Sequence, residues 1–230
     1  MTVAILETGA PPAALVDRFG TYPDMFRNLL GPERVGAIYD VTAGALPTDP
    51  RDHLAYLITG SAAGVYDPLP WIAPLKRFLQ DAHGQASLIG ICFGHQIMAA
   101  AFGGQVAKSD KGWGIGLQEY RLVAAWQDSG GDSIHVPVSH QDQVIDPPPG
   151  AMVLATSDFC GIGALRYRDQ SAISFQFHPE FEPDYAAALI ELRRAGHDNA
   201  DADAAIESLR APNDRERVAE WIKRFLDEAP

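Results

Sequence analysis

The sequence has little of what would tie a protein to a membrane or to an oxidising compartment. Its 230 residues include only 2 cysteines, Cys92 and Cys160, whose wide separation fits no disulfide framework and no metal-ligand spacing. No uninterrupted apolar run is long enough to cross a bilayer. The first residues lack the basic segment and apolar core of a signal peptide. We therefore expect a cytoplasmic protein with no membrane partner, in a compartment where a free thiol survives.

Positive charge is also scarce. The formal net charge is -12, and no cluster of lysine and arginine interrupts the acidic balance. Since a phosphate-binding face needs such a cluster, we expect no nucleic-acid partner. The chain has no P-loop and no Gly-rich nucleotide signature, so we predict no cofactor and no metal. A hydrophobic fraction of 47% is that of an ordinary globular protein.

The first hundred or so residues alternate between two kinds of segment. Short apolar runs of strand length lie at residues 3–6, 35–41, 54–59 and 87–91. Segments with helical periodicity lie between or after them, at residues 12–19, 22–30, 69–83 and 95–102. This alternation predicts an α/β fold with a parallel sheet. Functional loops in such folds follow the carboxyl ends of strands, where both Gly60 and Cys92 stand.

After Gly104 the pattern changes to closely spaced strands, which we expect to be antiparallel or mixed. The predicted strands are residues 105–107, 116–124, 133–138, 152–156, 162–167 and 172–177. The predicted helices that follow are residues 184–195, 200–209 and 214–226. With no repeat or linker, residues 1–230 are predicted to form one domain, with a core over about 1–195 and a C-terminal helical extension over about 196–230.

The pentapeptide Gly-Ile-Cys-Phe-Gly at residues 90–94 is the segment that says most about function. It joins a predicted strand to a predicted helix with the pattern glycine, any residue, nucleophile, any residue, glycine. The glycines are needed because a Cβ at either position would crowd the turn and the adjoining strand. The positive end of a helix favours a thiolate. An isolated cysteine is more often a buried apolar side chain, so Cys92 needs a base elsewhere in the chain.

A candidate base follows the last predicted strand, in the segment Phe-Gln-Phe-His-Pro-Glu at residues 175–180. In extended geometry, residues two apart face the same side, so His178 and Glu180 are expected to point toward one site. A nucleophilic cysteine needs a base that takes its proton and later protonates a leaving amine. A carboxylate orients that base and stabilises its cation. Cys160 has no motif around it and is interpreted as a structural thiol.

Together these segments resemble the class I, triad-type glutamine amidotransferases, in particular the branch that contains the glutaminase domain of GMP synthetase. The resemblance covers roughly residues 1–190. It is carried by the two main motifs at 90–96 and 176–180 and by the shorter segments at 59–61, 65–67, 111–114 and 138–144.

The resemblance implies a flavodoxin-like three-layer α/β/α sandwich with a mostly parallel central sheet and an additional small β section. It also implies hydrolysis of the glutamine side-chain amide through a γ-glutamyl thioester. Cys92 would be the nucleophile, His178 the acid and base, and Glu180 the residue that orients His178. The backbone amides of Gly60 and Phe93 would form the oxyanion hole.

The resemblance further implies a substrate-binding set. Gln96 would shape the glutamine pocket, while the backbone around Trp113 and around Ser139, His140 and Gln141 would hold the amino acid end. Lys-Gly-Trp-Gly at 111–114 stands where Arg-Glu-x-Gly is common, and Gln141 stands where a glycine is frequent. Both departures lie at the presumed amino acid end of the substrate.

Two other functions stay open beside a glutamine hydrolase, and the departures bear on the first of them. One is a γ-glutamyl peptidase that acts on γ-glutamyl conjugates, and the other is a catalytically silent regulatory or binding protein on the same scaffold. With no nucleotide-binding signature in these residues, we expect no ammonia-consuming domain among them. Either the ammonia passes to a separate synthetase subunit or the chain works alone, with glutamine or a γ-glutamyl compound as its substrate.

Overall fold

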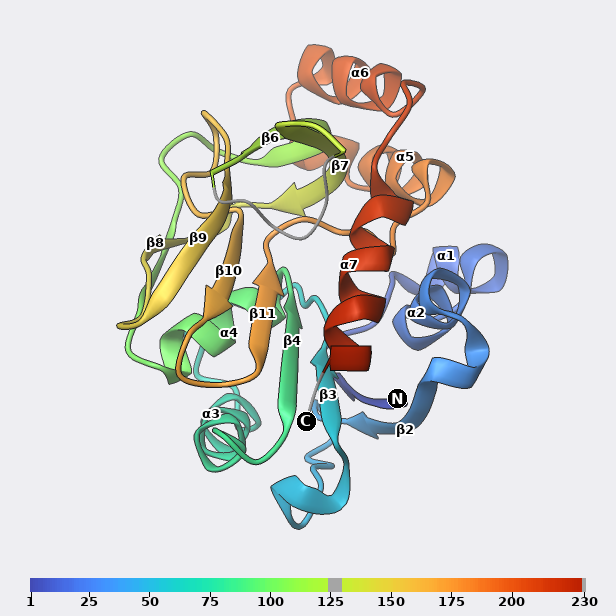
Figure 1. The fold of residues 1–230 in the computed structure, drawn as a ribbon. Helices are drawn as coiled ribbons and strands as arrows, with labels where there is room; N and C mark the ends of the chain where they lie inside the picture. The colour runs from blue at the N-terminus through green and yellow to red at the C-terminus, as the bar shows by residue number, and fades with distance from the viewer. Residues whose placement is uncertain (124–129, 229–230) are drawn as a thin grey trace.

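A nine-stranded sheet and a separate two-stranded sheet form the framework of the computed structural model, which describes residues 1–123 and 130–228 (Figure 1). The end of the predicted strand at 116–124, Ala124, lies outside the described residues. The strands are β1 (Val3–Glu7), β2 (Val35–Asp40), β3 (Ala55–Ile58), β4 (Ser87–Ile91), β5 (Gln105–Lys108), β6 (Gly114–Leu122), β7 (Ser133–His140), β8 (Asp142–Asp146), β9 (Ala151–Thr156), β10 (Ala164–Tyr167) and β11 (Ala172–Phe175).

The helices match most of the predicted segments to within a few residues. The α-helices are α1 (Ala13–Phe19), α2 (Tyr22–Leu30), α3 (Ile72–Asp81), α4 (Phe93–Ala101), α5 (Pro183–Leu192), α6 (Asn199–Ser208) and α7 (Arg215–Glu228). Short 3-10 helices are η1 (Pro32–Arg34), η2 (Pro50–Asp52) and η3 (Arg194–Gly196). Helix α4 begins at Phe93, earlier than predicted, and α5 ends at Leu192, earlier than predicted. Both differences affect the candidate site.

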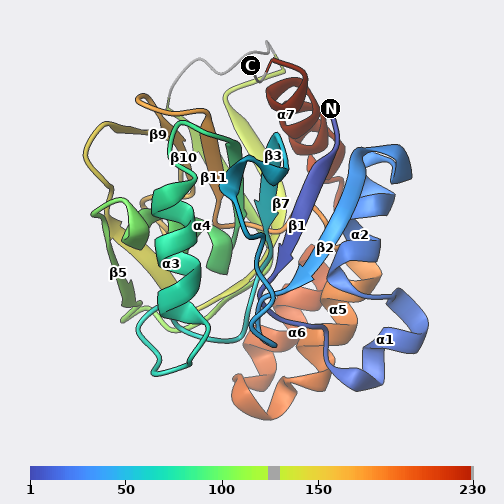
Figure 2. The same ribbon diagram turned by 90° about the horizontal axis from the view of Figure 1, so that it is seen from below.

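The parallel part of the large sheet has the order β2-β1-β3-β4-β11, and every neighbouring pair in it is parallel. Strands β3 and β4 are buried along their whole length, as continuous apolar runs in a covered parallel sheet should be. Helices α3 and α4 lie on one side of this sheet, and α2 and α7 lie on the other (Figure 2). The predicted three-layer α/β/α sandwich is confirmed.

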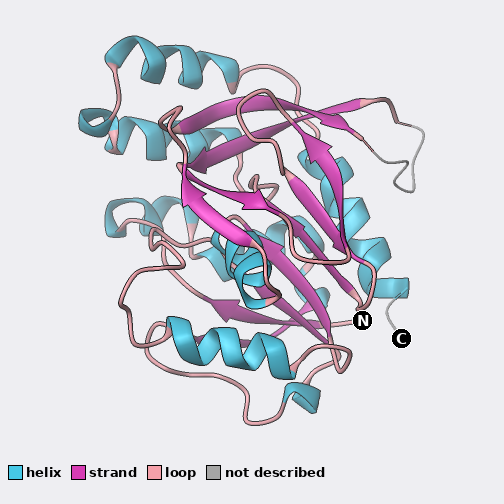
Figure 3. Cartoon of the chain, turned by 90° about the vertical axis from the view of Figure 1, so that its left-hand side faces the viewer, coloured by secondary structure: helices cyan, strands magenta, loops and turns pink. Residues whose placement is uncertain are grey.

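The remaining strands continue the same sheet in antiparallel fashion, in the order β11-β10-β9-β6-β7. Helices α5 and α6 pack against β6 at this end of the sheet, and Figure 3 shows the strands in magenta with cyan helices beside them. Strand β8 pairs with β5 in the separate small sheet. The predicted additional β section is therefore confirmed, although β8 itself was not predicted because its five residues directly follow β7 with no intervening turn signal.

Two buried clusters flank the parallel strands, because successive side chains on a strand face opposite sides. Val3 and Ile5 of β1 pack on the side of α2 and α7, whereas Ala4 and Leu6 pack on the side of α3 and α4. Trp221 of α7 is almost fully buried in the first cluster. We therefore propose that the C-terminal helices belong to the same domain as residues 1–195.

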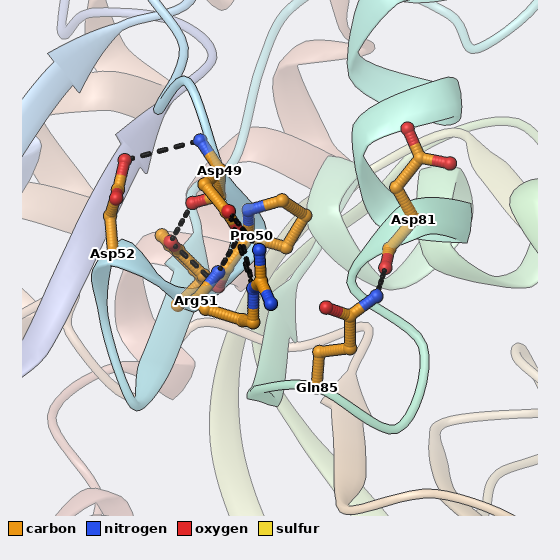
Figure 4. Close-up of polar contacts among 7 residues, drawn as sticks. Asp49, Pro50, Arg51, Asp52, Asp81 and Gln85 are labelled. Atoms are coloured by element: carbon orange, nitrogen blue, oxygen red, sulfur yellow. Dashed lines mark hydrogen bonds and ion pairs between the residues drawn. The ribbon is translucent and has the colours of Figure 1, made fainter.

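The amino ends of the strands carry surface loops stabilised by local hydrogen bonds. Asp49 caps η2, just before β3, and its carboxylate accepts hydrogen bonds from the backbone and side chain of Arg51 (Figure 4). Gln85 donates from its side chain to the carbonyl of Asp81 at the end of α3 (Figure 4). These contacts lie at the end of the sheet opposite to the candidate site. Within the described part of the chain, no helix is both long and apolar enough to cross a membrane.

Candidate active site

The candidate active site lies at the carboxyl ends of three adjacent parallel strands. Gly60 follows β3, Cys92 follows β4 and His178 follows β11, and these strands are neighbours in the sheet. A Cβ built on Gly60 would lie 3.0 Å from Cε1 of His178 and 3.7 Å from Cβ of Cys92. The fold therefore brings together three residues that span more than a hundred positions in the chain. All three were predicted from their motifs.

The turn at Cys92 places the thiol at the positive end of α4. Cys92 is the N-cap residue of α4 and has φ 51° and ψ -101°. It is the one non-glycine residue with positive φ in the described chain, a backbone conformation that side chains disfavour. A Cβ on Gly90 would lie 2.5 Å from the carbonyl oxygen of Gly94, and a Cβ on Gly94 would collide with the carbonyl of Ile58. The two glycines are therefore required by close packing, as the sequence predicted.

His178 and Glu180 form a buried hydrogen-bonded pair. Nδ1 of His178 donates to Oε1 of Glu180 over 2.7 Å, and the two side chains are only 4% and 1% exposed. Extended chain was expected here from the sequence, and that expectation is wrong: residues 176–180 form a bend and a turn. The turn is closed by a hydrogen bond from the Phe181 amide to the His178 carbonyl, which folds Glu180 back beneath the imidazole.

Opposing effects set the protonation of His178. Burial lowers the pKa of the imidazole, but the charges of Glu180 and Cys92, together with hydrogen bonds to both side chains, raise it to about 10. With Nδ1 bound to Glu180, Nε2 is the nitrogen that remains for Cys92. Phe181 stacks on the ring at a centroid distance of 3.9 Å and fixes its plane. The imidazole is thus held as a cation between a carboxylate and a thiol.

Two backbone N–H groups beside the thiol are available to a ligand. In residues 1–123 and 130–228, neither the amide of Gly60 nor that of Phe93 donates a hydrogen bond. Phe93 is the first residue of α4, so its N–H has no partner within the helix. Because α4 begins earlier than predicted, this amide also gains the positive potential of the helix end. The pair has the chemistry of an oxyanion hole.

A cavity of about 630 Å³ opens in front of Cys92 and His178. All of the predicted substrate-binding residues line it: Gln96, Trp113, Ser139, His140 and Gln141. Gln96 is buried and donates from its side chain to the carbonyl of Asp142 and to Oε1 of Gln176, so it braces the cavity wall. Trp113 is 44% exposed and meets the ring of His197 edge-on, at the cavity rim.

One wall of this cavity was not predicted from the sequence. Tyr22 of α2, together with Phe181, Leu189 and Arg193, also lines it. Phe181 follows the histidine motif directly, and that position could have suggested it. Tyr22 and Arg193 carry no local signal, because their place depends on how α2 and the end of α5 pack.

The side chains of His95, His140 and Cys160 are buried near the site, and burial favours their neutral forms. His95 is fully buried, where it pairs with Oγ of Ser174 and the carbonyl of Ile162, and burial lowers its pKa to about 3. Burial also lowers the pKa of His140 to about 4, so its ring is neutral. Burial raises the pKa of Cys160 to about 12. Among the described residues, no group of three or more His, Cys, Asp or Glu side chains is arranged to hold a metal.

A family model for "Glutamine amidotransferase class-I" matches residues 62–191, which is more than half of the sequence. The chain belongs to the class-I glutamine amidotransferase family. A glutamine amidotransferase-like protein of Schizosaccharomyces pombe is 28% identical over 97% of this chain and 98% of its own length. Gamma-glutamyl peptidase 2 of Arabidopsis thaliana is 28% identical over 76% of this chain and 74% of its own. A glutamine-hydrolysing GMP synthase subunit of Methanopyrus kandleri is 34% identical over 46% of this chain and 58% of its own.

Solved structures agree on the fold of this family member. A glutamine amidotransferase of Thermotoga maritima superimposes with a TM-score of 0.77 at 18% identity, covering 100% of this chain and 98% of that one. One from Methylobacillus flagellatus has a TM-score of 0.72 at 23% identity, covering 99% of this chain and 94% of that one. The match extends over the whole chain and therefore includes the C-terminal helices.

Proposed function

We propose that the chain is a cysteine-dependent hydrolase of γ-glutamyl amide bonds, with glutamine as the simplest substrate. The observation that carries this proposal is the buried His178–Glu180 pair facing Cys92, next to two backbone N–H groups that have no acceptor among the described residues. In the first step, Sγ of Cys92 attacks the γ-carbonyl carbon, and the amides of Gly60 and Phe93 stabilise the oxyanion. The amide nitrogen leaves with a proton from His178, and a γ-glutamyl thioester remains.

The second step needs His178 to act as a base. The charge of Cys92 is one of the causes that raise the pKa of His178. Acylation removes this charge, so the pKa of the imidazole falls once the thioester has formed and its proton has gone to the leaving amine. The neutral imidazole then takes a proton from water, whose oxygen attacks the thioester. Glutamate leaves, and both Cys92 and His178 return to their starting state.

We further propose that the cavity in front of the thiol holds the γ-glutamyl group. Ser139, Gln141 and Trp113 line this cavity and would contact the amino acid end of the substrate. His140 presents a neutral ring there, with Nδ1 donating to the carbonyl of Asp142. Similarity to relatives named as glutamine amidotransferases and γ-glutamyl peptidases supports this assignment.

The test is hydrolysis by the purified chain alone. We expect glutamate and ammonia from glutamine, loss of turnover in Cys92→Ala, and full turnover in Cys160→Ala, which removes the other thiol outside the site. Diazo-oxo-norleucine, a glutamine-analogue electrophile, should label Cys92 and no other residue, as read by peptide mass spectrometry. If purified protein neither turns over a γ-glutamyl amide nor is labelled, the silent binding protein is the better assignment. Activity that requires an added synthetase would instead indicate an ammonia-delivering subunit.

A second candidate, a γ-glutamyl peptidase, is favoured by the size of the cavity. A volume of about 630 Å³ lies within the range of about 300 to 1,000 Å³ typical of sites for drug-sized ligands, which are much larger than glutamine. Both candidates share one acyl-enzyme, so the triad does not separate them. Comparing kcat/KM for glutamine and for a γ-glutamyl dipeptide does separate them, and a clear preference for the dipeptide would select the peptidase.

A further inference from the structure

We propose that Arg193 binds a carboxylate on the leaving group, so that the preferred substrates are γ-glutamyl peptides whose leaving amine is an amino acid. This inference rests on the proposed hydrolysis of γ-glutamyl amides. It gives a function to the cavity wall that contains Arg193, which lies outside the motifs at 90–96 and 176–180. It follows from three observations: where the leaving group must lie, the lack of an ion-pair partner for Arg193 among the described residues, and the elements from which the two cationic side chains of the cavity come.

The position of the leaving group follows from the chemistry. Its nitrogen receives a proton from His178, so it lies on the His178 side of the thiol. On this side the cavity is lined by Phe181, which stacks on His178, and by Tyr22, which stacks on Phe181 at a centroid distance of 5.9 Å. A leaving group larger than ammonia would therefore extend over this aromatic wall.

Arg193 lies at the same wall. It lines the cavity together with Tyr22 and Phe181, and its charge opposes the rise that burial causes in the pKa of the Tyr22 and Tyr185 hydroxyls. Helix α5 ends at Leu192, and Arg193 is its C-cap residue, with its amide hydrogen-bonded to the carbonyl of Leu189. In the described part of the chain, the guanidinium makes no hydrogen bond and no ion pair, although the side chain is partly buried. Its neighbour Arg194 is paired with both Glu191 and Asp203.

The cavity has two cationic side chains of lysine or arginine among its described lining residues, and they come from different elements of the fold. Lys108 of β5 is in register with Asp142 of β8, so it lies beside residues 139–142 at the end proposed for the γ-glutamyl group. Arg193 stands at the leaving-group end. A γ-glutamyl dipeptide carries one carboxylate at each end, whereas glutamine carries only the first.

The charge and the planar shape of a guanidinium both suit the binding of a substrate carboxylate. A chain with a net charge of -12 repels anionic ligands, so a substrate with two carboxylates needs a cation near each of them. The planar guanidinium fits a carboxylate through two parallel hydrogen bonds. Such charge-assisted contacts are strong enough to change affinity by about tenfold.

The test compares two ligands that differ only in the leaving-group carboxylate, γ-glutamyl-alanine and γ-glutamyl-alaninamide. In a Cys92→Ala background, calorimetry should give about tenfold tighter binding of the dipeptide. Adding Arg193→Met should weaken the dipeptide by about tenfold, leave the amide within about twofold and so abolish the preference. Arg193→Lys should restore part of it. Lys108→Met should weaken both ligands equally, and Arg194→Gln should weaken neither.

The same variants with Cys92 intact give kcat/KM, which should show the same pattern. A preference that survives Arg193→Met, or an equal loss for both ligands, overturns the assignment of Arg193, and so does a parent protein that binds neither. If glutamine is hydrolysed but the two peptides are not distinguished, the proposed function stands and this inference fails. If binding depends on Arg193 but no amide is cleaved, the site is real and the proposed hydrolysis fails.

Discussion

The two ends of the sheet each carry a pair of oppositely charged side chains two residues apart, and the pairs differ in burial. At the amino ends, Arg51 and Asp49 are 72% and 38% exposed, and Asp49 also serves as a local cap (Figure 4). At the carboxyl ends, His178 and Glu180 are 4% and 1% exposed. Water screens the first pair, so it does little beyond ordering its loop. The second pair is cut off from water, and the charge of Glu180 raises the pKa of His178. Burial, more than the contact itself, therefore decides whether such a pair can hold a side chain in the protonation state that catalysis needs.

The largest expected effect is on turnover. Glu180→Gln keeps the shape but removes the charge that holds His178 as an oriented cation, so kcat for γ-glutamyl amide hydrolysis should fall by about 10² to 10⁴. Asp49→Asn, the matched change at the exposed pair, should leave kcat unchanged. Steady-state kinetics on both variants decide the matter. An unchanged kcat in Glu180→Gln would remove Glu180 from the mechanism.

The same contrast should appear in stability. Glu180→Ala leaves the buried His178 without its partner, so the free energy of unfolding should fall by about 3 to 5 kcal/mol. Asp49→Ala should cause a much smaller loss, because its partner is already solvated and only the cap of η2 is removed. Urea unfolding of the two variants alongside the parent measures both changes. Equal losses would show that burial does not distinguish the pairs.

The pH dependence of stability should separate the pairs further. The pKa of His178 is raised from 6.5 to about 10 in the folded chain, because the charges of Glu180 and Cys92 outweigh the opposing effect of burial. A raised folded-state pKa stabilises the protein fully below about pH 6.5, and that contribution is lost as the pH rises through about 10. Unfolding free energies measured from pH 6 to 10 should therefore decline more steeply in the parent than in Glu180→Gln. Parallel curves would contradict the assignment.

The smallest effect concerns the geometry of the site. A Cβ at position 60 would lie 3.0 Å from the His178 ring, so Gly60→Ala should displace the imidazole slightly and lower kcat by about tenfold. Gly161→Ala is the matched control, because a Cβ there meets no atom within 4 Å. The control should keep the parent kcat. A Gly60→Ala variant with parent activity would show that the ring has room to shift.

Sequence patterns predicted those parts of the protein that are fixed locally. The boundaries of β4 and α2 were predicted to the residue, because a short apolar run of strand length and a helical segment stopped by Gly31 and Pro32 are local signals. The turn at Cys92 was predicted because its two glycines stand on either side of it. The pairing of His178 with Glu180 was predicted from an extended chain, yet a turn produces it.

The cavity wall formed by Tyr22 and Arg193 could not be predicted in this way. Tyr22 belongs to α2 and Arg193 follows α5, and only the packing of these helices on the sheet brings both to the cavity. The early end of α5 at Leu192 was also missed, because the helical segment continues through Ala195 in the sequence and hides the change to the 3-10 helix η3.

The positive φ of Cys92 has a consequence for how such a protein can lose its catalytic activity by mutation. Holding any side chain at φ 51° costs on the order of 1 to 3 kcal/mol, and glycine alone among the residues avoids that strain. A chain with glycine at position 92 would therefore fold more stably while lacking the nucleophile. Inactive variants of this fold that lack the cysteine would therefore have a higher free energy of unfolding than the active protein. Selection for catalytic activity is what retains Cys92.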